Sequence, residues 1–332
     1  MISSRFLRPA LAAAAALLVA ACSDRAPTAA DAPSLAAASP VVRWQKVASL
    51  PGAFDLTVAP DGALWAAAAD RGVMRSADGF QWTAVAPLAD GDEAGAIVAL
   101  SSGDLYIGTT TGIYLSQDAG SSWIPVGLQD LYITHLAADD RGTVYAAAPG
   151  FLGGIYRGER LALGQMHWTR IFEPLGAREA FYDFLTVHRG DVFVGPYSQT
   201  PYWGRDGGAS FEPIFALWEL PDFPAFADDM LETRDGAVLA AYAGGIGRST
   251  DGGQSFQHVY AGLPAWKFTT DERTRSIYAL VYEGRVIRST DDGATWQPFA
   301  AAPPMTGISD IAVAADGRLV VSGYEGSWKT VR

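Results

Sequence analysis

Cysteine, histidine and basic residues are all scarce in this chain of 332 residues. It has one cysteine, four histidines, and 24 lysines and arginines against 36 aspartates and glutamates. A single cysteine excludes an intramolecular disulfide, and no two of the histidines have metal-ligand spacing. The formal net charge of -12 argues against nucleic acid as a partner and against broad attachment to anionic lipid. Cationic, neutral or metal-bridged partners remain open, and the folded part must be stabilised by its apolar core.

Apolar residues near the start form no run long enough to span a bilayer as a stable helix. The run at 10–21 follows Arg5 and Arg8, which is the pattern of an export signal that is removed from the mature protein. It ends in Val19-Ala20-Ala21-Cys22, which resembles the lipobox of bacterial lipoproteins. An ordinary secretory cleavage beside a free thiol is the alternative.

The lipobox resemblance implies that Cys22 becomes the mature N-terminus and carries a diacylglycerol and an N-acyl chain, which together anchor stably. Ser23 behind it implies the outer membrane, so we expect a lipid-anchored cell-envelope protein facing the periplasm. Residues 23–40 are too polar and too small to bury a core. We therefore predict a signal peptide at 1–21, a flexible tether at 22–40 and one folded domain at 41–332.

One pattern of serine, aspartate, glycine and an aromatic residue occurs five times. The copies are Ser76-Ala77-Asp78-Gly79 to Trp82, Ser116-Gln117-Asp118-Ala119-Gly120 to Trp123, Asp206-Gly207-Gly208 to Phe211, Ser249-Thr250-Asp251-Gly252-Gly253 to Phe256, and Ser289-Thr290-Asp291-Asp292-Gly293 to Trp296. They resemble the Asp-box, or BNR, repeat of sialidases, sortilin-type receptors, xyloglucanases and a photosystem II assembly factor. The first copy is one residue short, and the third has Gly204 in place of serine.

The spacing of the repeat predicts the fold. The closing aromatics at 82, 123, 168, 211, 256 and 296 lie 41, 45, 43, 45 and 40 residues apart, which is the span of one four-stranded propeller blade. The chain ends after a segment, 326–330, that matches only a third strand, while Trp44-Gln45-Lys46-Val47 resembles a fourth. We predict an all-β, seven-bladed β-propeller of four-stranded blades whose N-terminal strand completes the last blade. Blade three, with an insertion at 157–167 and no Asp box, is the outlier.

Asp78, Asp118, Asp206, Asp251 and Asp291 suit a structural role in these repeats. Aspartate and serine side chains accept backbone N–H bonds in tight turns, and glycine supplies a positive φ. In propellers that the chain resembles, these turns lie opposite the binding face. We also interpret the arginines before the boxes, Arg75, Arg248 and Arg288, as structural.

Ionisable residues recur where each innermost strand begins. A fixed count back from the turn glycines gives Asp55, Ala96, Asp183, Asp229 and Asp310, and alignment of the two blades with longer turns gives His135 and Lys267. Two interpretations stay open. The ring is a solvated rim that fixes loop backbone, or its carboxylates bind a polar ligand or a divalent cation such as Ca²⁺ through oxygen. We assign no metal ligands and expect no other cofactor.

Aromatic residues offer a second group of binding candidates on the same face. The loop at 214–228 carries Phe215, Trp218, Phe223 and Phe226 beside carboxylates, which suits stacking on a sugar, although they can also pack the loop onto its own blade. Further candidates on this face are Tyr182, Tyr197, Tyr202, Trp266, Tyr282, Tyr324 and Arg285.

The resemblance to sialidases suggests a catalytic set that the sequence matches only in part. Sialidases use an arginine triad, a tyrosine nucleophile with a glutamate, and an aspartate acid. Here Tyr182, Glu179, Asp183 and Asp229 are the catalytic candidates, but the first arginine motif is absent and Arg71, Arg178 and Arg285 lie in unmatched contexts. We therefore predict a monomeric, non-catalytic envelope lipoprotein that binds a protein partner or a glycan through a propeller face. An exo-acting, sialidase-like glycoside hydrolase is the alternative.

Overall fold

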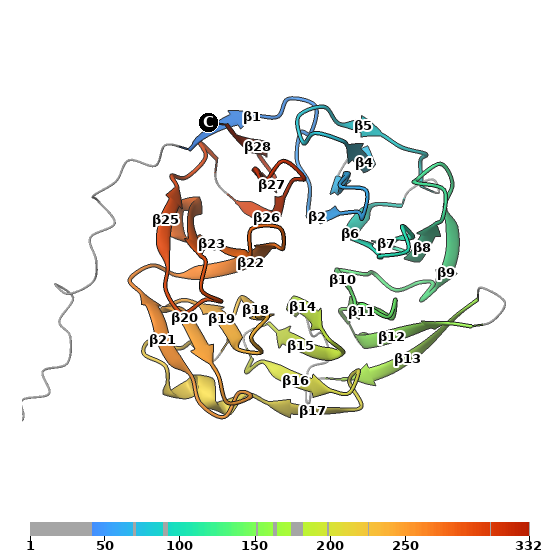
Figure 1. The fold of residues 1–332 in the computed structure, drawn as a ribbon. Helices are drawn as coiled ribbons and strands as arrows, with labels where there is room; N and C mark the ends of the chain where they lie inside the picture. The colour runs from blue at the N-terminus through green and yellow to red at the C-terminus, as the bar shows by residue number, and fades with distance from the viewer. Residues whose placement is uncertain are drawn as a thin grey trace, which may run out of the picture. The chain divides into compact units, whose positions relative to one another are not determined.

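The described residues form one ring of seven antiparallel sheets. The structure is a computed structural model that describes residues 42–68, 71–88, 92–150, 152–161, 165–173, 182–197, 199–224, 226–305 and 307–331. All of them belong to one of the two units into which the chain divides, Leu35–Arg332. Each sheet has four strands, and the first strand of each lies innermost around a central axis (Figure 1). The predicted seven-bladed propeller is confirmed.

The strands follow one another blade by blade. Blade 1 has β2 (Asp55–Val58), β3 (Leu64–Ala68), β4 (Gly72–Ser76) and β5 (Thr83–Ala84). Blade 2 has β6 (Ala94–Ala99), β7 (Leu105–Thr109), β8 (Gly112–Ser116) and β9 (Ile124–Gly127). Blade 3 has β10 (His135–Ala138), β11 (Val144–Ala148), β12 (Gly154–Arg160) and β13 (Met166–Phe172). Blade 4 has β14 (Tyr182–His188), β15 (Asp191–Pro196), β16 (Tyr202–Arg205) and β17 (Ser210–Pro213).

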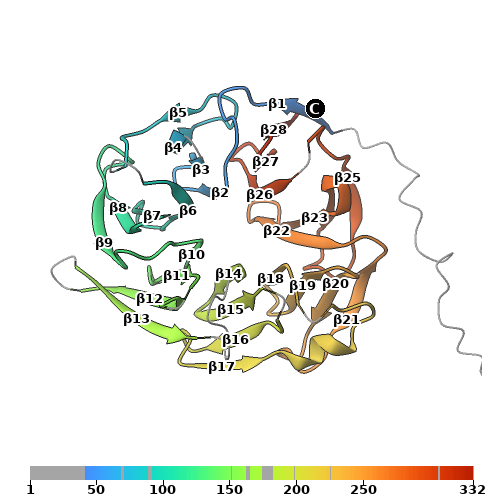
Figure 2. The ribbon, with the colours of Figure 1, turned by 180° about the vertical axis from the view of Figure 1, so that it is seen from behind.

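The remaining blades continue the order, which Figure 2 shows from behind. Blade 5 has β18 (Asp229–Glu232), β19 (Val238–Tyr242), β20 (Gly245–Ser249) and β21 (Gln257–Ala261). Blade 6 has β22 (Ala265–Asp271), β23 (Ser276–Val281), β24 (Arg285–Ser289) and β25 (Gln297–Ala300). Blade 7 has β26 (Ile308–Val313), β27 (Leu319–Gly323), β28 (Gly326–Val331) and β1 (Arg43–Lys46). In the described part of the chain, the 3₁₀ helices η2 (Phe215–Glu219) and η3 (Tyr282–Gly284) lie in loops.

The two ends of the folded chain share blade 7. Strand β1 pairs antiparallel with β28, and the register places Arg43 opposite Val331 and Lys46 opposite Trp328. In Figure 1 the blue β1 lies beside the red β28. This pairing closes the ring without an open sheet edge between the last blade and the first, as the sequence predicts.

The core consists of seven apolar clusters, one between each pair of neighbouring blades. The second strands explain this arrangement, because successive side chains of a strand point to opposite faces of its sheet. In β3, Leu64, Ala66 and Ala68 pack toward blade 7, whereas Trp65 and Ala67 pack toward blade 2. The alanines let neighbouring sheets approach closely, so short strands suffice to bury both faces.

Candidate functional site

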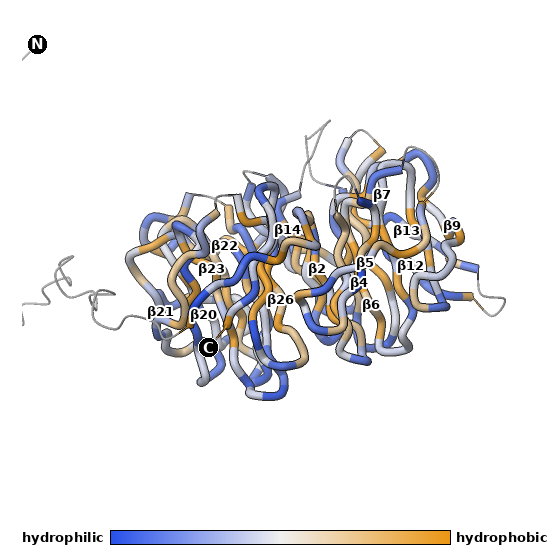
Figure 3. The backbone as a smooth tube through the Cα atoms, turned by 90° about the horizontal axis from the view of Figure 1, so that it is seen from above, coloured by the Kyte–Doolittle hydropathy of each residue, from blue (hydrophilic) through white to orange (hydrophobic). Residues whose placement is uncertain are grey.

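The antiparallel order of each blade sorts its connections onto two faces of the ring. The turns from first to second and from third to fourth strands lie on one face, which we term the turn face. The loops from second to third strands and from each fourth strand to the next blade lie on the other, the loop face. The loop face comprises the described residues within 47–54, 69–71, 85–93, 110–111, 128–134, 149–153, 173–181, 197–201, 214–228, 243–244, 262–264, 282–284, 301–307 and 324–325. Seen from the side, hydrophilic residues gather at the turns along one edge (Figure 3).

The predicted Asp boxes form turns between third and fourth strands on the turn face. In blade 5, Ser249 Oγ accepts the Gly253 N–H at 2.9 Å and donates to Asp251 Oδ1 at 2.8 Å. Asp251 Oδ1 also accepts the Ser255 N–H at 3.0 Å. The equivalent serine and aspartate side chains hold the turns at Asp78, Asp118 and Asp291. Every polar group of these turns that the sequence singled out is occupied within the turn, which favours the structural interpretation. The third copy differs, because Gly204 offers no hydroxyl and Asp206 has a φ of 51°.

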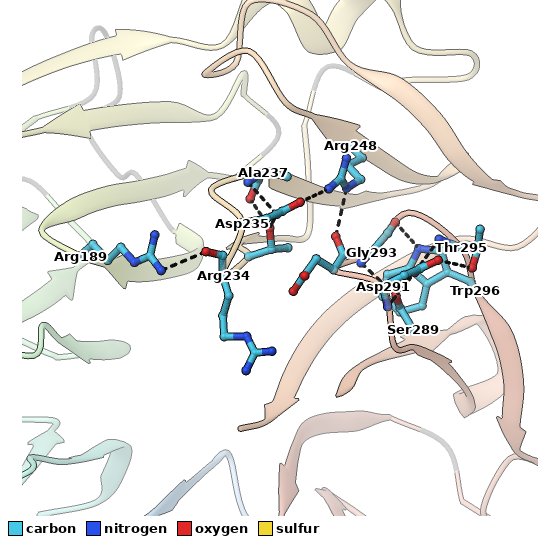
Figure 4. A network of polar contacts seen from close by, with 12 residues as sticks. Arg189, Arg234, Asp235, Ala237, Arg248, Ser289, Asp291, Gly293, Thr295 and Trp296 are labelled. Carbon is cyan, nitrogen blue, oxygen red and sulfur yellow. Dashed lines mark hydrogen bonds and ion pairs between the residues drawn. The ribbon is translucent and has the colours of Figure 1, made fainter. Parts of the chain in front are cut away.

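Basic side chains on the third strands of two blades connect each of these blades to the next one. Figure 4 shows Arg248 of blade 5, which donates to Asp235 Oδ2 at 2.6 Å in its own blade and to the Asp292 carbonyl of blade 6 at 3.0 Å. Lys329 of blade 7 makes the corresponding bonds to Asp316 and to the Asp78 carbonyl of blade 1. These bridges occupy the guanidinium of Arg248 and the ammonium of Lys329, which supports a structural role for both residues.

On the loop face, the start of the innermost strands surrounds an axial cavity of about 280 Å³. All seven blades contribute to its lining, which consists of Phe54, Asp55, Gly95, Thr134, His135, Leu136, Asp183, Leu185, Asp228, Trp266, Lys267, Ile308, Ser309 and Asp310. Five of the predicted ring residues, Asp55, His135, Asp183, Lys267 and Asp310, therefore come together around one space. Asp229 is not among the residues that line it.

Three ring carboxylates hold the innermost strand of the next blade. Asp310 Oδ2 accepts the Leu56 N–H at 2.8 Å, Asp55 Oδ2 accepts the Ile97 N–H at 2.8 Å, and Asp229 Oδ2 accepts the Phe268 N–H at 2.9 Å. Each bond crosses from one blade to its neighbour. Within the described residues, no group of three or more acidic, histidine or cysteine side chains has the geometry of a metal site. The geometry therefore favours the fixing of backbone over cation binding for these three groups.

The charges in the axial cavity perturb one another. Although burial lowers it, the charges of Asp229, Asp310 and Asp55 raise the pKa of Lys267 above its ordinary value, and its Nζ lies 3.9 Å from Asp310 Oδ1. Burial and the charge of Asp310 raise the pKa of Asp55 well above its usual range. Burial lowers the pKa of His135 to about 4, so the imidazole is neutral at pH 7.

Asp228 is a cavity residue that the count along the strands missed. It precedes β18, outside the repeating position, and belongs to the long loop at 214–228. Burial, with the charges of Asp183 and Asp229, raises the pKa of Asp228 to about 7. Only its place in that acidic loop could have indicated it, because its contact with the axis depends on how the loop folds back.

Exposed aromatic side chains all gather on the loop face. Among the described residues, six aromatic side chains are largely exposed, and each lies in a loop of this face: Tyr132, Tyr197, Phe215, Trp218, Tyr282 and Tyr324. Leu217 and Leu220 of the loop at 214–228 are buried and fasten it to blades 4 and 5, whereas Trp218 is 57% exposed. The two sequence interpretations of this loop each hold for part of it, because Phe223 packs against Tyr242 and Trp218 does not join that core.

A second cavity of about 510 Å³ opens beside the axial one on the loop face. Phe54, Arg71, Glu93 and Tyr324 line it together with Pro51, Gly52, Ala53 and Gly323. Phe54 lines both cavities, and its ring meets that of Tyr324 edge to face at 5.5 Å between centroids. The loop face thus combines two adjoining hollows with a border of exposed rings.

The other predicted residues lie apart from this centre. Tyr182 is 6% exposed in the core between blades 3 and 4, and burial raises its pKa above the ordinary value, the opposite of what an activated nucleophile needs. Tyr202 packs against Phe172 on a strand. Trp266 lines the axial cavity, and Arg285 on the loop-face end of β24 pairs with Glu283 at 2.8 Å.

Several sequence predictions lie outside the described residues. These are the signal peptide at 1–21, the lipidation site Cys22, the tether to residue 40, and the candidates Glu179 and Arg178. Within the described part of the chain, no helix has the length and apolar character that a membrane span requires.

Comparison with protein-family models and with curated proteins finds no match. Solved structures do match. A structure of YCF48 bound to a D1 peptide is 15% identical with a TM-score of 0.68, over 87% of this chain and 96% of the other. A streptogramin B lyase is 16% identical with a TM-score of 0.66, over 87% and 97%. A virginiamycin B lyase from Staphylococcus aureus is 11% identical with a TM-score of 0.63, over 87% and 98%. At these identities the likeness shows one thing about this chain, its β-propeller fold.

Proposed function

We propose that this protein is a non-catalytic lipoprotein of the cell envelope that binds a protein partner through its loop face. In this proposal Cys22 carries the lipid, and the propeller is held at the outer membrane facing the periplasm. The turns on the opposite face act as structural Asp boxes. A glycan is the competing ligand, and the tests below distinguish it.

The gathering of all six exposed aromatic side chains on one face carries the proposal. Tyrosine and tryptophan are enriched at the centres of protein interfaces, where they contribute large contact areas at a small cost in conformational entropy. A structure without a binding role would scatter such side chains singly over its surface. The solved complex of YCF48 with a D1 peptide supports the proposal only as a precedent for a peptide ligand on this fold.

The described residues do not favour the hydrolase alternative. A retaining hydrolase needs two catalytic groups facing one pocket, but Tyr182 is buried away from the axial cavity. Of the carboxylates that remain, Asp55 and Asp310 are occupied by backbone N–H groups of the next blade. Two of the four carboxylates that line the axial cavity therefore have a structural role, and Asp183 and Asp228 are the other two.

Site-directed photocrosslinking in living cells tests the proposal. A photoreactive phenylalanine analogue is placed at Trp218 or Tyr324 on the loop face, and at Ile124 on the outer strand of blade 2 as the control. The control is well matched, because Ile124 is 52% exposed and Trp218 57%. We expect a discrete protein adduct from the two loop-face positions and none from Ile124. Equal adducts from all three positions, or none from any, would contradict the proposal.

A further inference from the structure

We infer that the partner presents a cationic segment, rich in arginine or lysine, to the loop face. This inference rests on the proposed function and adds the chemistry of the partner. Three observations support it: the charge of the loops, the placement of aromatic rings beside carboxylates, and the charge of the residues that line the axial cavity.

The charged residues in the loops of the loop face are almost all acidic. Among their described residues, nine are acidic, namely Asp92, Glu93, Asp130, Glu173, Glu219, Asp222, Asp228, Glu283 and Glu325, and one is basic, Arg71. The turn face is mixed instead, with Arg141, Arg189, Arg234, Arg273, Arg275 and Arg318 among its carboxylates. Among the described residues, the turn face therefore carries thirteen carboxylates and six arginines, whereas the charged residues of the loop face are nearly all of one sign.

Some of these loop carboxylates pair with basic residues of the chain, and others do not pair with any described residue. Glu283 pairs with Arg285, and Glu173 pairs with Arg170. Glu93, Asp130 and Glu219 are exposed and form no ion pair with any described residue. A surface of one sign attracts a partner of the other sign before contact and orients it on approach.

Rings and carboxylates alternate along these loops. An exposed aromatic residue is followed directly by glutamate three times, at Trp218-Glu219, Tyr282-Glu283 and Tyr324-Glu325, and Asp130 lies two residues before Tyr132. A guanidinium stacks on an aromatic face and donates parallel hydrogen bonds to a carboxylate. Trp218 with Glu219, and Tyr132 with Asp130, therefore offer both contacts that an arginine side chain uses, because neither carboxylate forms an ion pair with a described residue.

Acidic residues also outnumber basic residues in the lining of the axial cavity. Asp55, Asp183, Asp228 and Asp310 line it, against Lys267 and the neutral His135, and burial raises the pKa values of Asp55 and Asp228 so that these two contribute less negative charge at pH 7. The adjoining cavity is lined by Glu93 and Arg71 together with the rings of Phe54 and Tyr324. Nucleic acids and anionic lipid surfaces are repelled by such a face, so the occupant that fits is a basic stretch of protein.

A binding measurement with defined peptides tests this inference. The full chain, purified in a neutral detergent, is titrated into a fluorescein-labelled peptide of about twelve residues that alternates arginine and glycine, at about 150 mM salt. A glutamate–glycine peptide of the same length and a neutral glycan array are the comparison ligands. We expect saturable binding of the arginine peptide and none of the glutamate peptide or the glycans.

Two triple variants of equal charge locate the binding. Glu93→Gln, Asp130→Asn and Glu219→Gln remove three carboxylates from the loop face, and Asp140→Asn, Asp206→Asn and Glu272→Gln remove three from the turn face. Asparagine tolerates the positive φ of Asp130 and Asp206. We expect the loop-face triple to weaken binding about tenfold or more and the turn-face triple by less than about twofold. Circular dichroism confirms that both variants are folded.

The outcomes separate this inference from the proposed function. Equal weakening by both triples would mean that the peptide responds to net charge alone and would overturn the inference. So would failure of the arginine peptide to bind, or binding of glycans in its place. If crosslinks at Trp218 persist in that case, the protein partner stands and only its cationic character is lost. If the crosslinks are absent as well, both proposals fail.

Discussion

Aspartate has two opposite environments in this ring, and its neighbours decide which. On the turn face, Asp118 and Asp251 are in water and accept several hydrogen bonds, led by Ser122 and Ser255, which lower both pKa values to about 2. At the axis, burial raises the pKa values of Asp55, Asp228 and Asp229. The turn stabilises the ionised form of the first group. The carboxylates of the second group are buried, and burial disfavours their ionised form.

We expect Asp251→Ala to lower the melting temperature by about 3 °C at pH 7, because the turn loses its acceptor for the Ser255 N–H. The pKa of Asp251 is lower in the folded chain than the ordinary value of 3.8. Its contribution is therefore complete above pH 4 and disappears as the pH falls through 2. Calorimetry of both proteins between pH 7 and pH 2 measures this. A melting temperature unchanged at pH 7 would refute the structural role, and Asp140→Ala is the control.

Asp228 predicts the reverse pH dependence. Its pKa of about 7 lies above the ordinary 3.8, so between these values the folded chain binds a proton that the unfolded chain has released. Stability from this group is present below pH 4 and is lost as the pH rises through 7. We expect Asp228→Asn to match the wild type at pH 4 and to exceed it by on the order of 1 kcal/mol at pH 8.

Thermal unfolding at the two pH values checks this difference. His135, whose pKa burial lowers to about 4, titrates in both proteins and cancels in the comparison. Asp222→Asn, on the same loop, is the matched control. A difference that is the same at pH 4 and pH 8 would show that Asp228 does not titrate in this window.

At the scale of residues, the sequence predicts positions better than contacts. Counting from the turn glycines placed Asp55, Asp183 and Asp310 at the axis, because the repeat fixes where each innermost strand begins. It could not show that the Asp229 carboxylate accepts the Phe268 N–H, because the two residues belong to different blades. The position of Asp228 at the axis and the burial of Tyr182 could not be predicted for the same reason, because loop folding and burial against a neighbour leave no periodic signal.

At the scale of strands, alternation and turn chemistry were sufficient to predict the fold. Each second strand is buried on both faces, and its period of two supplies one cluster on either side. The repeat length then gives the blade, and the absence of one fourth strand at the end of the chain pointed to β1. The short β5, with two residues, was not evident, because its segment resembles the other fourth strands in composition.

Strand β1 should be indispensable to stability. Deletion of residues 42–46 exposes the β28 edge and uncovers Trp328, which is 6% exposed in the closed ring. We expect the melting temperature to fall by roughly 10 °C or more, as lost ladder bonds and apolar contacts add up to several kcal/mol. Deletion of residues 36–40 as a control should leave it unchanged. A stable, unaltered ring after the first deletion would refute closure by this strand.

At the scale of the whole molecule, we expect membrane attachment to depend on one atom, the sulfur of Cys22. Cys22→Ser should abolish incorporation of labelled palmitate and move the protein from the membrane to the soluble fraction, since stable anchoring requires two chains. Fractionation of cells that produce either form measures this. Ser23→Ala serves as the control. Retention of the Cys22→Ser protein in the membrane would point to another means of attachment.

Because Arg43 pairs with Val331, the strands of this fold could also be connected in a different order along the chain. In the other blades a turn joins the third strand to the fourth, and blade 7 lacks one because these strands come from opposite ends of the sequence. A short linker with the sequence of the Ser289–Trp296 turn could join Val331 to Arg43, and the polypeptide could then be opened at another blade. Such a circular permutant would keep every strand pair while moving its free ends, and with them any point of attachment, to a chosen place on the rim.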